Sequence, residues 1–135
     1  MKITVEKIRE EALKGYTEYS GIELLEADDG YAIGRVLIKD HHLNPSGAVH
    51  GGITFCLGDV IGGIACVTVD ALPVTVSTSI TYMRPMLGVK EITARADVIK
   101  RGKTTLFVEI SIYDDQGNET GRLLATYYDM KGRAK

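Results

Sequence analysis

Asp59 is the side chain in this sequence that most strongly suggests chemistry. It is the only acidic or basic residue between His50 and Asp70, in a segment otherwise made of apolar residues, glycines and threonines. Burying an unpaired carboxylate is costly and perturbs its protonation, so such a residue is seldom retained without a task. We therefore expect a functional role. The structural alternative is a carboxylate that caps another element or pairs with a buried arginine.

The tripeptide His50-Gly51-Gly52 begins the same segment. If the segment is a helix, its first turn carries unpaired N–H groups and the positive end of the helix dipole. Glycine has no Cβ to cover those groups, so a ligand oxygen can approach them, as in an oxyanion hole built from main chain. The alternative is that the two glycines only begin a tight turn.

The spacing between Gly51 and Asp59 bears on assembly. The two residues are eight positions apart, which is about 12 Å along a straight helix. One substrate atom cannot contact both groups of one chain at hydrogen-bonding distance. If both serve one site, Asp59 comes from a second copy whose helix runs antiparallel across a two-fold axis. The protein is then a homodimer with two sites at its interface.

The segment that carries both features, residues 50–69, is apolar on every side and about as long as a membrane span. Its five glycines, the central Asp59 and the flanking strand patterns argue against a membrane span. We expect a central helix wrapped by the apolar face of a curved antiparallel sheet. Gly58 and Gly62 would let another backbone come close to this helix.

Alternating apolar and polar residues predict the strands of that sheet. Asp29-Gly30 is a hairpin signal between apolar runs at 22–28 and 31–39. Further strands are expected at residues 74–82, 91–100, 104–113 and 122–130. The odd positions of the first of these all carry hydroxyls and predict one hydroxyl-lined face: Thr75, Ser77, Ser79 and Thr81.

Length and composition set the remaining bounds. The 135 residues suffice for a single domain over residues 1–135, which begins with a short helix at about 2–14 capped by Thr4. A hydrophobic content of 44% with 25% charged residues is typical of globular proteins. The formal net charge of −2 argues against a nucleic-acid partner. Residues 1–14 carry no export signal, so a cytoplasmic protein without a membrane partner is expected.

These residues resemble the hotdog-fold acyl-CoA thioesterases, in the branch of the phenylacetate-pathway (PaaI-like) thioesterases and their animal relatives. The first matching motif is Asn44-x-x-Gly47-x-x-His50-Gly51-Gly52, with Asp59 seven residues later and Gly63-x-Ala65 beyond. A second match is Val74-Thr75-Val76 leading into Ile80-Thr81-Tyr82-Met83-Arg84-Pro85. The resemblance covers about residues 20–130. It implies an α+β hotdog fold, a curved antiparallel sheet wrapped around a long central helix.

The resemblance also implies roles for individual residues. The Gly51 amide and the Asn44 side chain would hold the thioester carbonyl oxygen or the attacking water. Asp59 of the opposing subunit would act as general base or as nucleophile. Thr75 matches a Ser or Thr that positions the water or the aspartate. His50 would orient the loop through its ring or take part in catalysis, and Asn44 is alternatively a plain turn residue.

The coenzyme of such a substrate carries phosphates, which need cations. The candidates are basic residues at strand ends and in a turn, and the alternative for each is a solvated surface charge: Arg84, Lys100, Arg101 and Lys103. No metal is expected, because His41-His42 has no third ligand at a recognisable spacing and is interpreted as loop. No cofactor is expected either, since coenzyme A is part of the substrate.

The implied activity is hydrolysis of an acyl-CoA thioester by a homodimer that pairs into a dimer of dimers. One alternative is a hotdog hydratase or dehydratase of enoyl or hydroxyacyl thioesters. Such enzymes use an Asp–His pair at a different spacing, whereas His50 and Asp59 are nine residues apart. The other alternative is a non-catalytic acyl-CoA binding protein, which would need an output domain for which 135 residues leave no room.

Overall fold

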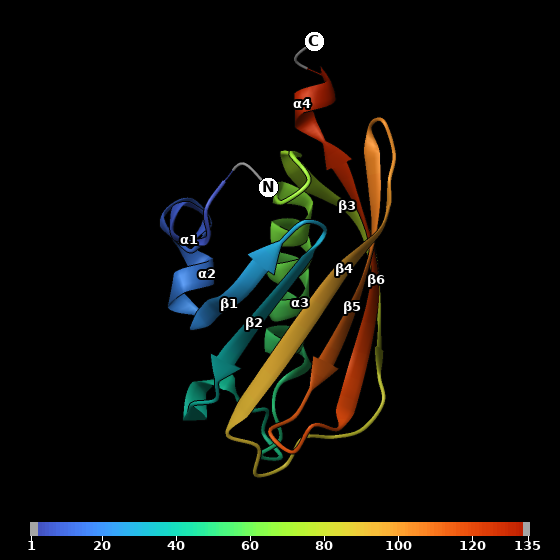
Figure 1. Ribbon diagram of the computed structural model, residues 1–135. Helices are drawn as coiled ribbons and strands as arrows, with labels where there is room; N and C mark the ends of the chain where they lie inside the picture. The colour runs from blue at the N-terminus through green and yellow to red at the C-terminus, as the bar shows by residue number, and fades with distance from the viewer. Residues whose placement is uncertain (1–2, 134–135) are drawn as a thin grey trace.

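The computed structural model describes residues 3–133 as a six-stranded antiparallel sheet curved around one long helix (Figure 1). This confirms the expected α+β architecture. The elements in chain order are α1 (Val5–Ala12), α2 (Tyr16–Tyr19), β1 (Ile22–Asp28), β2 (Tyr31–Leu37), η1 (Asp40–His42), α3 (Gly51–Val67), β3 (Pro73–Tyr82), β4 (Glu91–Arg101), β5 (Thr105–Tyr113), β6 (Glu119–Asp129) and α4 (Met130–Arg133).

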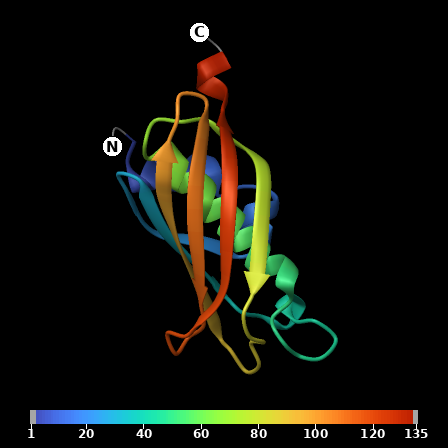
Figure 2. The same cartoon turned by 90° about the vertical axis from the view of Figure 1, so that its right-hand side faces the viewer.

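The strand order is β1-β2-β4-β5-β6-β3, and all neighbouring strands are antiparallel. The hairpin expected at Asp29-Gly30 joins β1 to β2, with Gly30 at φ 88°. After β2 the chain runs through α3 to the opposite edge of the sheet, where β3 pairs with β6 alone (Figure 2, yellow beside red). The outer edge of β3 therefore offers backbone N–H and C=O groups for pairing with another strand.

The core lies between one face of α3 and the concave face of the sheet. Leu57, Ile61 and Ala65 of α3 are fully buried and lie four residues apart, on one side of the helix. Burial of each large aliphatic side chain contributes about 1.5–3 kcal/mol. The sheet covers this side of α3 with alternate residues of its strands, among them Ile92, Ala94, Ala96, Leu106, Val108, Ile110, Ile112, Leu123 and Ala125.

Gly58 and Gly62 admit side chains of β6 rather than another backbone, which corrects the expectation for this pair. A Cβ at Gly58 would lie 2.7 Å from Leu123 Cδ2, and one at Gly62 would lie 2.4 Å from the Tyr127 hydroxyl oxygen. Both glycines therefore let α3 sit close to β6. The closest approach is to the tyrosine hydroxyl.

The helix boundaries differ slightly from the expected ones. The central helix is shorter than 50–69, because it begins at Gly51, after His50 as N-cap, and ends at Val67. The N-terminal helix is α1 alone; its cap is Thr4, as expected, whose hydroxyl oxygen accepts the Lys7 N–H at 3.1 Å. A further short helix, α2, is not predicted by the sequence pattern. Within residues 3–133, no helix is both long and apolar enough to cross a membrane.

One side of α3 stays uncovered by the sheet of its own chain. A half-buried stripe runs along the helix beside the β3 edge: Phe55, Cys56, Asp59, Val60, Gly63 and Val67. On the neighbouring edge strand β3, Val74 and Val76 are 50% and 62% exposed. The apolar composition of this helix therefore exceeds what a single chain buries.

Candidate active site

The first turn of α3 is built by His50. Its backbone (φ −64°, ψ 134°) is extended, and its ring Nδ1 accepts the Gly52 N–H at 2.8 Å. The His50 carbonyl oxygen accepts the Ile53 N–H at 3.2 Å. The structure therefore places the His50 ring as a helix cap, and its proximity to Gly52 leaves no room for a Cβ there.

Gly51 keeps a free amide in this turn, since no described residue accepts a hydrogen bond from its N–H. Besides the expected access of a ligand to this amide, the structure gives a second reason for a glycine here. A Cβ at Gly51 would lie 3.0 Å from Cζ and from the hydroxyl oxygen of Tyr82, at the end of β3. The Tyr82 hydroxyl also donates to the Gly51 carbonyl oxygen at 2.8 Å. The tyrosine thus occupies the space beside Gly51.

Asp59 lies two turns further along α3 and is half-buried. The Thr75 hydroxyl of β3 donates to its Oδ1 at 2.8 Å, so the structure brings together two of the expected site residues. A hydrogen bond to a carboxylate contributes about 1.5–3 kcal/mol. Thr75 therefore orients the aspartate of its own chain.

A β-bulge aims Thr75 at Asp59. The register between β3 and β6 shifts between Thr75, which pairs with Tyr127, and Ser77, which pairs with Thr126. Tyr127 is buried on the helix side of the sheet, so Thr75 faces α3, whereas Ser77 faces away. The expectation of one face with all four hydroxyls is therefore wrong. Bulges next to active sites commonly re-aim a side chain in this way.

Tyr127 is a further residue at Asp59, and sequence reasoning missed it. Its hydroxyl donates to the Asp59 carbonyl oxygen at 2.7 Å and lies 3.3 Å from Oδ1. Burial, and then the Asp59 charge, raise the pKa of Tyr127, so its hydroxyl stays a donor. Only the pairing of β6 with β3 places this tyrosine beside α3. Tyr82 was also missed as a site residue, although it lies in the second matching motif.

Gly51 and Asp59 stay apart within the chain. Both lie on α3, eight residues apart, which is about 12 Å. Their hydrogen-bond partners also differ: Tyr82 donates to Gly51, while Thr75 and Tyr127 donate to Asp59. One chain therefore carries an amide donor and an oriented carboxylate at two separate places on α3.

Asn44 organises the loop before α3. Its Oδ1 accepts the N–H groups of Ser46 at 2.9 Å and Ala48 at 3.1 Å, as in a turn residue. No described residue accepts a hydrogen bond from its Nδ2 group. The side chain can therefore hold the loop with its oxygen and still donate to a ligand.

The four basic candidates lie at two ends of the sheet. Arg84 follows β3, at the same end as Tyr82 and Gly51. The pKa of Asp114 is lowered chiefly by a hydrogen bond from the Asn118 backbone N–H, and the Arg84 charge lowers it further. The remaining three, Lys100, Arg101 and Lys103, lie around the β4–β5 turn at the other end. Arg101 is engaged there, since its Nη2 donates to Asp129 Oδ2 at 2.7 Å.

The His41-His42 pair has a structural place in the fold. It lies in η1, a 3₁₀ turn rather than an irregular loop. His42 is buried, with Nε2 2.8 Å from the Ser20 carbonyl oxygen and Nδ1 accepting the Lys39 N–H at 2.9 Å. Among residues 3–133, no group of three or more His, Cys, Asp or Glu is placed to hold a metal ion.

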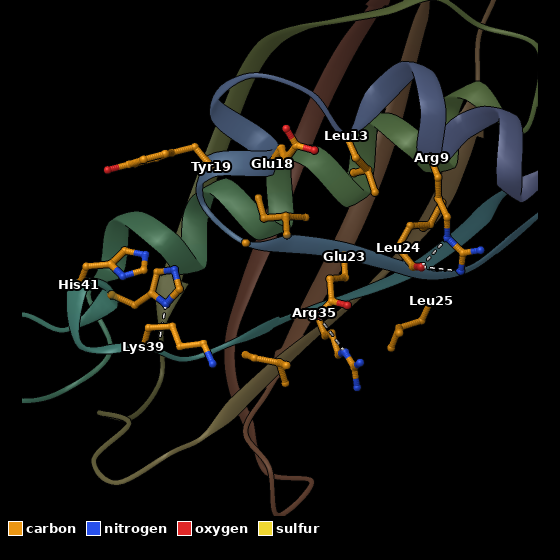
Figure 3. Close-up of a pocket in the computed structure, with 14 residues that line it drawn as sticks. Arg9, Leu13, Glu18, Tyr19, Glu23, Leu24, Leu25, Arg35, Lys39 and His41 are labelled. Carbon is orange, nitrogen blue, oxygen red and sulfur yellow. Dashed lines mark hydrogen bonds and ion pairs between the residues drawn. The ribbon is translucent and has the colours of Figure 1, made fainter.

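Two cavities lie near the start of α3. A groove of about 850 Å³ between the N-terminal helices and β1–β2 contains none of the candidate site residues (Figure 3). Its arginines are engaged, because Arg9 donates to the Leu24 carbonyl oxygen and Arg35 pairs with Glu23. A cavity of about 370 Å³ adjoins the helix start instead; its lining includes Tyr16, Tyr19, His50, Gly52 and Ile53.

Comparisons with known proteins agree with this architecture. The profile of the Thioesterase superfamily matches residues 46–120. Acyl-coenzyme A thioesterase 13 of Homo sapiens is 35% identical over 106 residues, 77% of this chain and 74% of the relative. Acyl-coenzyme A thioesterase PaaI of Escherichia coli is 30% identical over 96 residues, 71% of this chain and 69% of the relative.

A solved structure gives the same result for the fold. The crystal structure of a hypothetical thioesterase from Streptococcus pneumoniae with coenzyme A superposes with a TM-score of 0.75 at 25% identity, over 80% of this chain and 84% of that one. The expected resemblance to the hotdog-fold acyl-CoA thioesterases of the PaaI-like branch is confirmed by these relatives. The chain therefore belongs to the thioesterase superfamily.

Proposed function

We propose that this protein hydrolyses acyl-CoA thioesters to a free acid and coenzyme A at two sites on a homodimer interface. Two groups on α3 carry the proposal: a free Gly51 N–H at the helix start and an Asp59 carboxylate oriented by Thr75. Each would supply half of a site shared between two copies. The names of the relatives, acyl-coenzyme A thioesterases, support the substrate class.

The chemistry follows from what each group offers. The thioester carbonyl oxygen accepts the Gly51 N–H, aided by the helix dipole and by the Asn44 amide. Asp59 of the partner copy takes a proton from water, and the hydroxide adds to the carbonyl carbon. Collapse of the tetrahedral intermediate releases coenzyme A as thiolate. Alternatively Asp59 attacks directly and water then hydrolyses the mixed anhydride. One oxyanion donor lowers the activation barrier by about 3–4 kcal/mol.

The homodimer is supported by the uncovered side of α3. The half-buried stripe needs a cover that the chain itself does not supply. The free edge of β3 lies beside it. A second copy with an antiparallel α3 covers the stripe, extends the sheet through β3, and brings its Asp59 toward Gly51 of the first copy.

The same geometry bears on the coenzyme. Arg84 lies at the Gly51 end of the sheet, and Lys100 and Lys103 at the other end. In a dimer with antiparallel helices, the end of the sheet that carries Lys100 and Lys103 in one copy faces the Arg84 end of its partner. We therefore propose that Arg84 and the partner's lysines share the phosphates, while Arg101 stays paired with Asp129. The cavity beside Gly52 offers Tyr16, Tyr19 and Ile53 as walls for the acyl group.

Pairing of dimers is proposed at the outer face of the sheet. Three exposed apolar side chains meet there across neighbouring strands: Ile99, Phe107 and Leu124, which are 61%, 42% and 54% exposed. A contact of this face with its own copy would bury them in a dimer of dimers.

The test is thiol release from a panel of acyl-CoA substrates by the wild type and by Asp59→Asn. We expect a folded variant with kcat lowered by about a hundredfold or more. Asp97→Asn, an exposed carboxylate on the outer face of the sheet, is the matched control. Near-normal turnover by Asp59→Asn removes this residue from the mechanism. Hydration of an enoyl-CoA without thiol release supports the hydratase instead, and binding without turnover supports a binding protein.

A further inference from the structure

The hydroxyl of Tyr127 is held at one point of α3. It donates to the Asp59 carbonyl oxygen at 2.7 Å, with Oδ1 of the same residue at 3.3 Å as a second acceptor. Tyr127 is 1% exposed, so no solvent competes for this hydroxyl. A buried tyrosine hydroxyl needs a partner, and here both partners belong to the proposed catalytic residue.

Gly62 makes room for this contact. A Cβ at position 62 would lie 2.4 Å from the Tyr127 hydroxyl oxygen and 3.2 Å from Cζ. At the next position, Gly63, a Cβ would lie at an ordinary 3.8 Å from the same ring. The glycine at position 62 is therefore matched to the tyrosine hydroxyl.

The two oxygens of the Asp59 carboxylate have different surroundings. Oδ1 receives the Thr75 hydroxyl at 2.8 Å from β3 and faces the Tyr127 hydroxyl from β6. No described residue donates to Oδ2. Two strands thus hold the carboxylate by one oxygen, and the other oxygen keeps its lone pairs for a ligand.

We propose that Tyr127, seated by Gly62, is a positioning residue that fixes Asp59 so that Oδ2 is the oxygen that reacts. The inference rests on the proposed thioesterase function and adds a residue to it. Tyr127 does not touch the substrate. It limits rotation of the Asp59 side chain, which preorganises the carboxylate for the transition state.

The first test is Tyr127→Phe, which removes the hydroxyl and keeps the ring. Losing one neutral hydrogen bond that is needed in the transition state lowers the rate constant of the chemical step by about fivefold. We therefore expect kcat to fall about fivefold while KM stays within about twofold, measured by thiol release at a temperature where both proteins are folded. The matched control is Tyr31→Phe, which loses a tyrosine–carboxylate bond to Glu26 elsewhere on the sheet and should keep kcat.

The second test is a double-mutant cycle with Gly62→Ala. We expect this variant to lower kcat in the wild-type background, because its Cβ displaces the Tyr127 hydroxyl. In the Tyr127→Phe background it should lower kcat by less than about twofold further, since the atom it would meet at 2.4 Å is gone. Gly58→Ala, whose Cβ meets Leu123 at 2.7 Å, is the packing control: its Tm falls and its kcat does not.

Three results would overturn the inference while leaving the thioesterase function intact: an unchanged kcat in folded Tyr127→Phe, a loss confined to KM, or a fully additive cycle. Each would assign Tyr127 a packing role alone. A wild type that releases no thiol from any acyl-CoA overturns the proposed function, and the inference with it.

Discussion

The hydroxyl of Tyr82 donates a hydrogen bond to the carbonyl oxygen of Gly51 at 2.8 Å, which ties the end of β3 to the first turn of α3. His50 Nδ1 accepts the N–H of Gly52 at 2.8 Å, so the peptide between the two glycines is held at both its C=O and its N–H. The Gly51 N–H next to this peptide therefore has a fixed direction. A donor to a developing oxyanion needs that fixed direction.

Tyr82→Phe tests this relationship. The variant keeps the ring beside Gly51 and loses only the bond to the carbonyl oxygen. Because one neutral hydrogen bond is removed, kcat should fall about fivefold with little change in KM. Thiol-release kinetics measure both constants, and Tyr31→Phe again serves as control. A kcat equal to that of the wild type would show that the helix cap alone fixes the Gly51 amide.

Gly51→Pro tests the amide donor itself. Proline lacks the N–H, is well tolerated at the first position of a helix, and suits an extended preceding residue such as His50 at ψ 134°. Gly51→Ala is the matched control, because it brings the same Cβ against Tyr82 and keeps the N–H. We expect kcat of the proline variant to lie about 10²–10³-fold below that of the alanine variant. Equal values in the two variants would assign the loss to the Cβ.

Local patterns were enough to predict most of the fold. The Asp29-Gly30 hairpin, the strand positions and the central helix each follow from turn chemistry or from the period of apolar residues, and the structure has them. The bulge at Thr75 does not follow from such patterns. An alternating run of hydroxyls predicts one face whether or not a residue is inserted, and the pairing with β6 decides the insertion.

The same distinction applies to the site. Asp59 stood out because its charge is alone in an apolar helix, and Gly51 because its position at a helix start matches a family motif. Tyr82 and Tyr127 come to these residues from strands far along the chain. Their roles depend on β3 returning to the edge beside β6 and on α3 crossing both strands. A sequence pattern contains neither fact.

His42 should make stability depend on pH. Burial, together with the charges of His41 and Lys39, lowers the pKa of His42, despite the bond to Ser20. Its Nδ1 accepts the Lys39 N–H, so a proton on Nδ1 would place an N–H of the ring directly against the Lys39 N–H. The unfolded chain takes up this proton near pH 6.5, before the folded one does. The free energy of unfolding should therefore fall as the pH drops from about 7 to 5.

Urea denaturation at several pH values measures this dependence. In His42→Gln, the free energy of unfolding should change less with pH, because the contribution of this histidine to the slope is gone. The variant should also be less stable than the wild type at neutral pH. His41→Gln removes the exposed neighbour, whose charge is a smaller cause than burial, and should keep most of the slope. An unchanged slope in His42→Gln would mean that other groups set the acid sensitivity.

Mixing two inactive variants tests whether each site is shared between copies. Asp59→Asn keeps the Gly51 amide, and Gly51→Pro keeps the carboxylate. In a mixed dimer, one site combines both defects and the other combines both intact groups. Random exchange makes half of the dimers mixed, so activity should return to roughly one quarter of the wild-type value. Co-expression or refolding of the two variants together, followed by thiol-release assays, measures the recovery. Because Gly51 and Asp59 of one chain are about 12 Å apart on a single helix, a mixture as inactive as its parents would contradict the shared site directly.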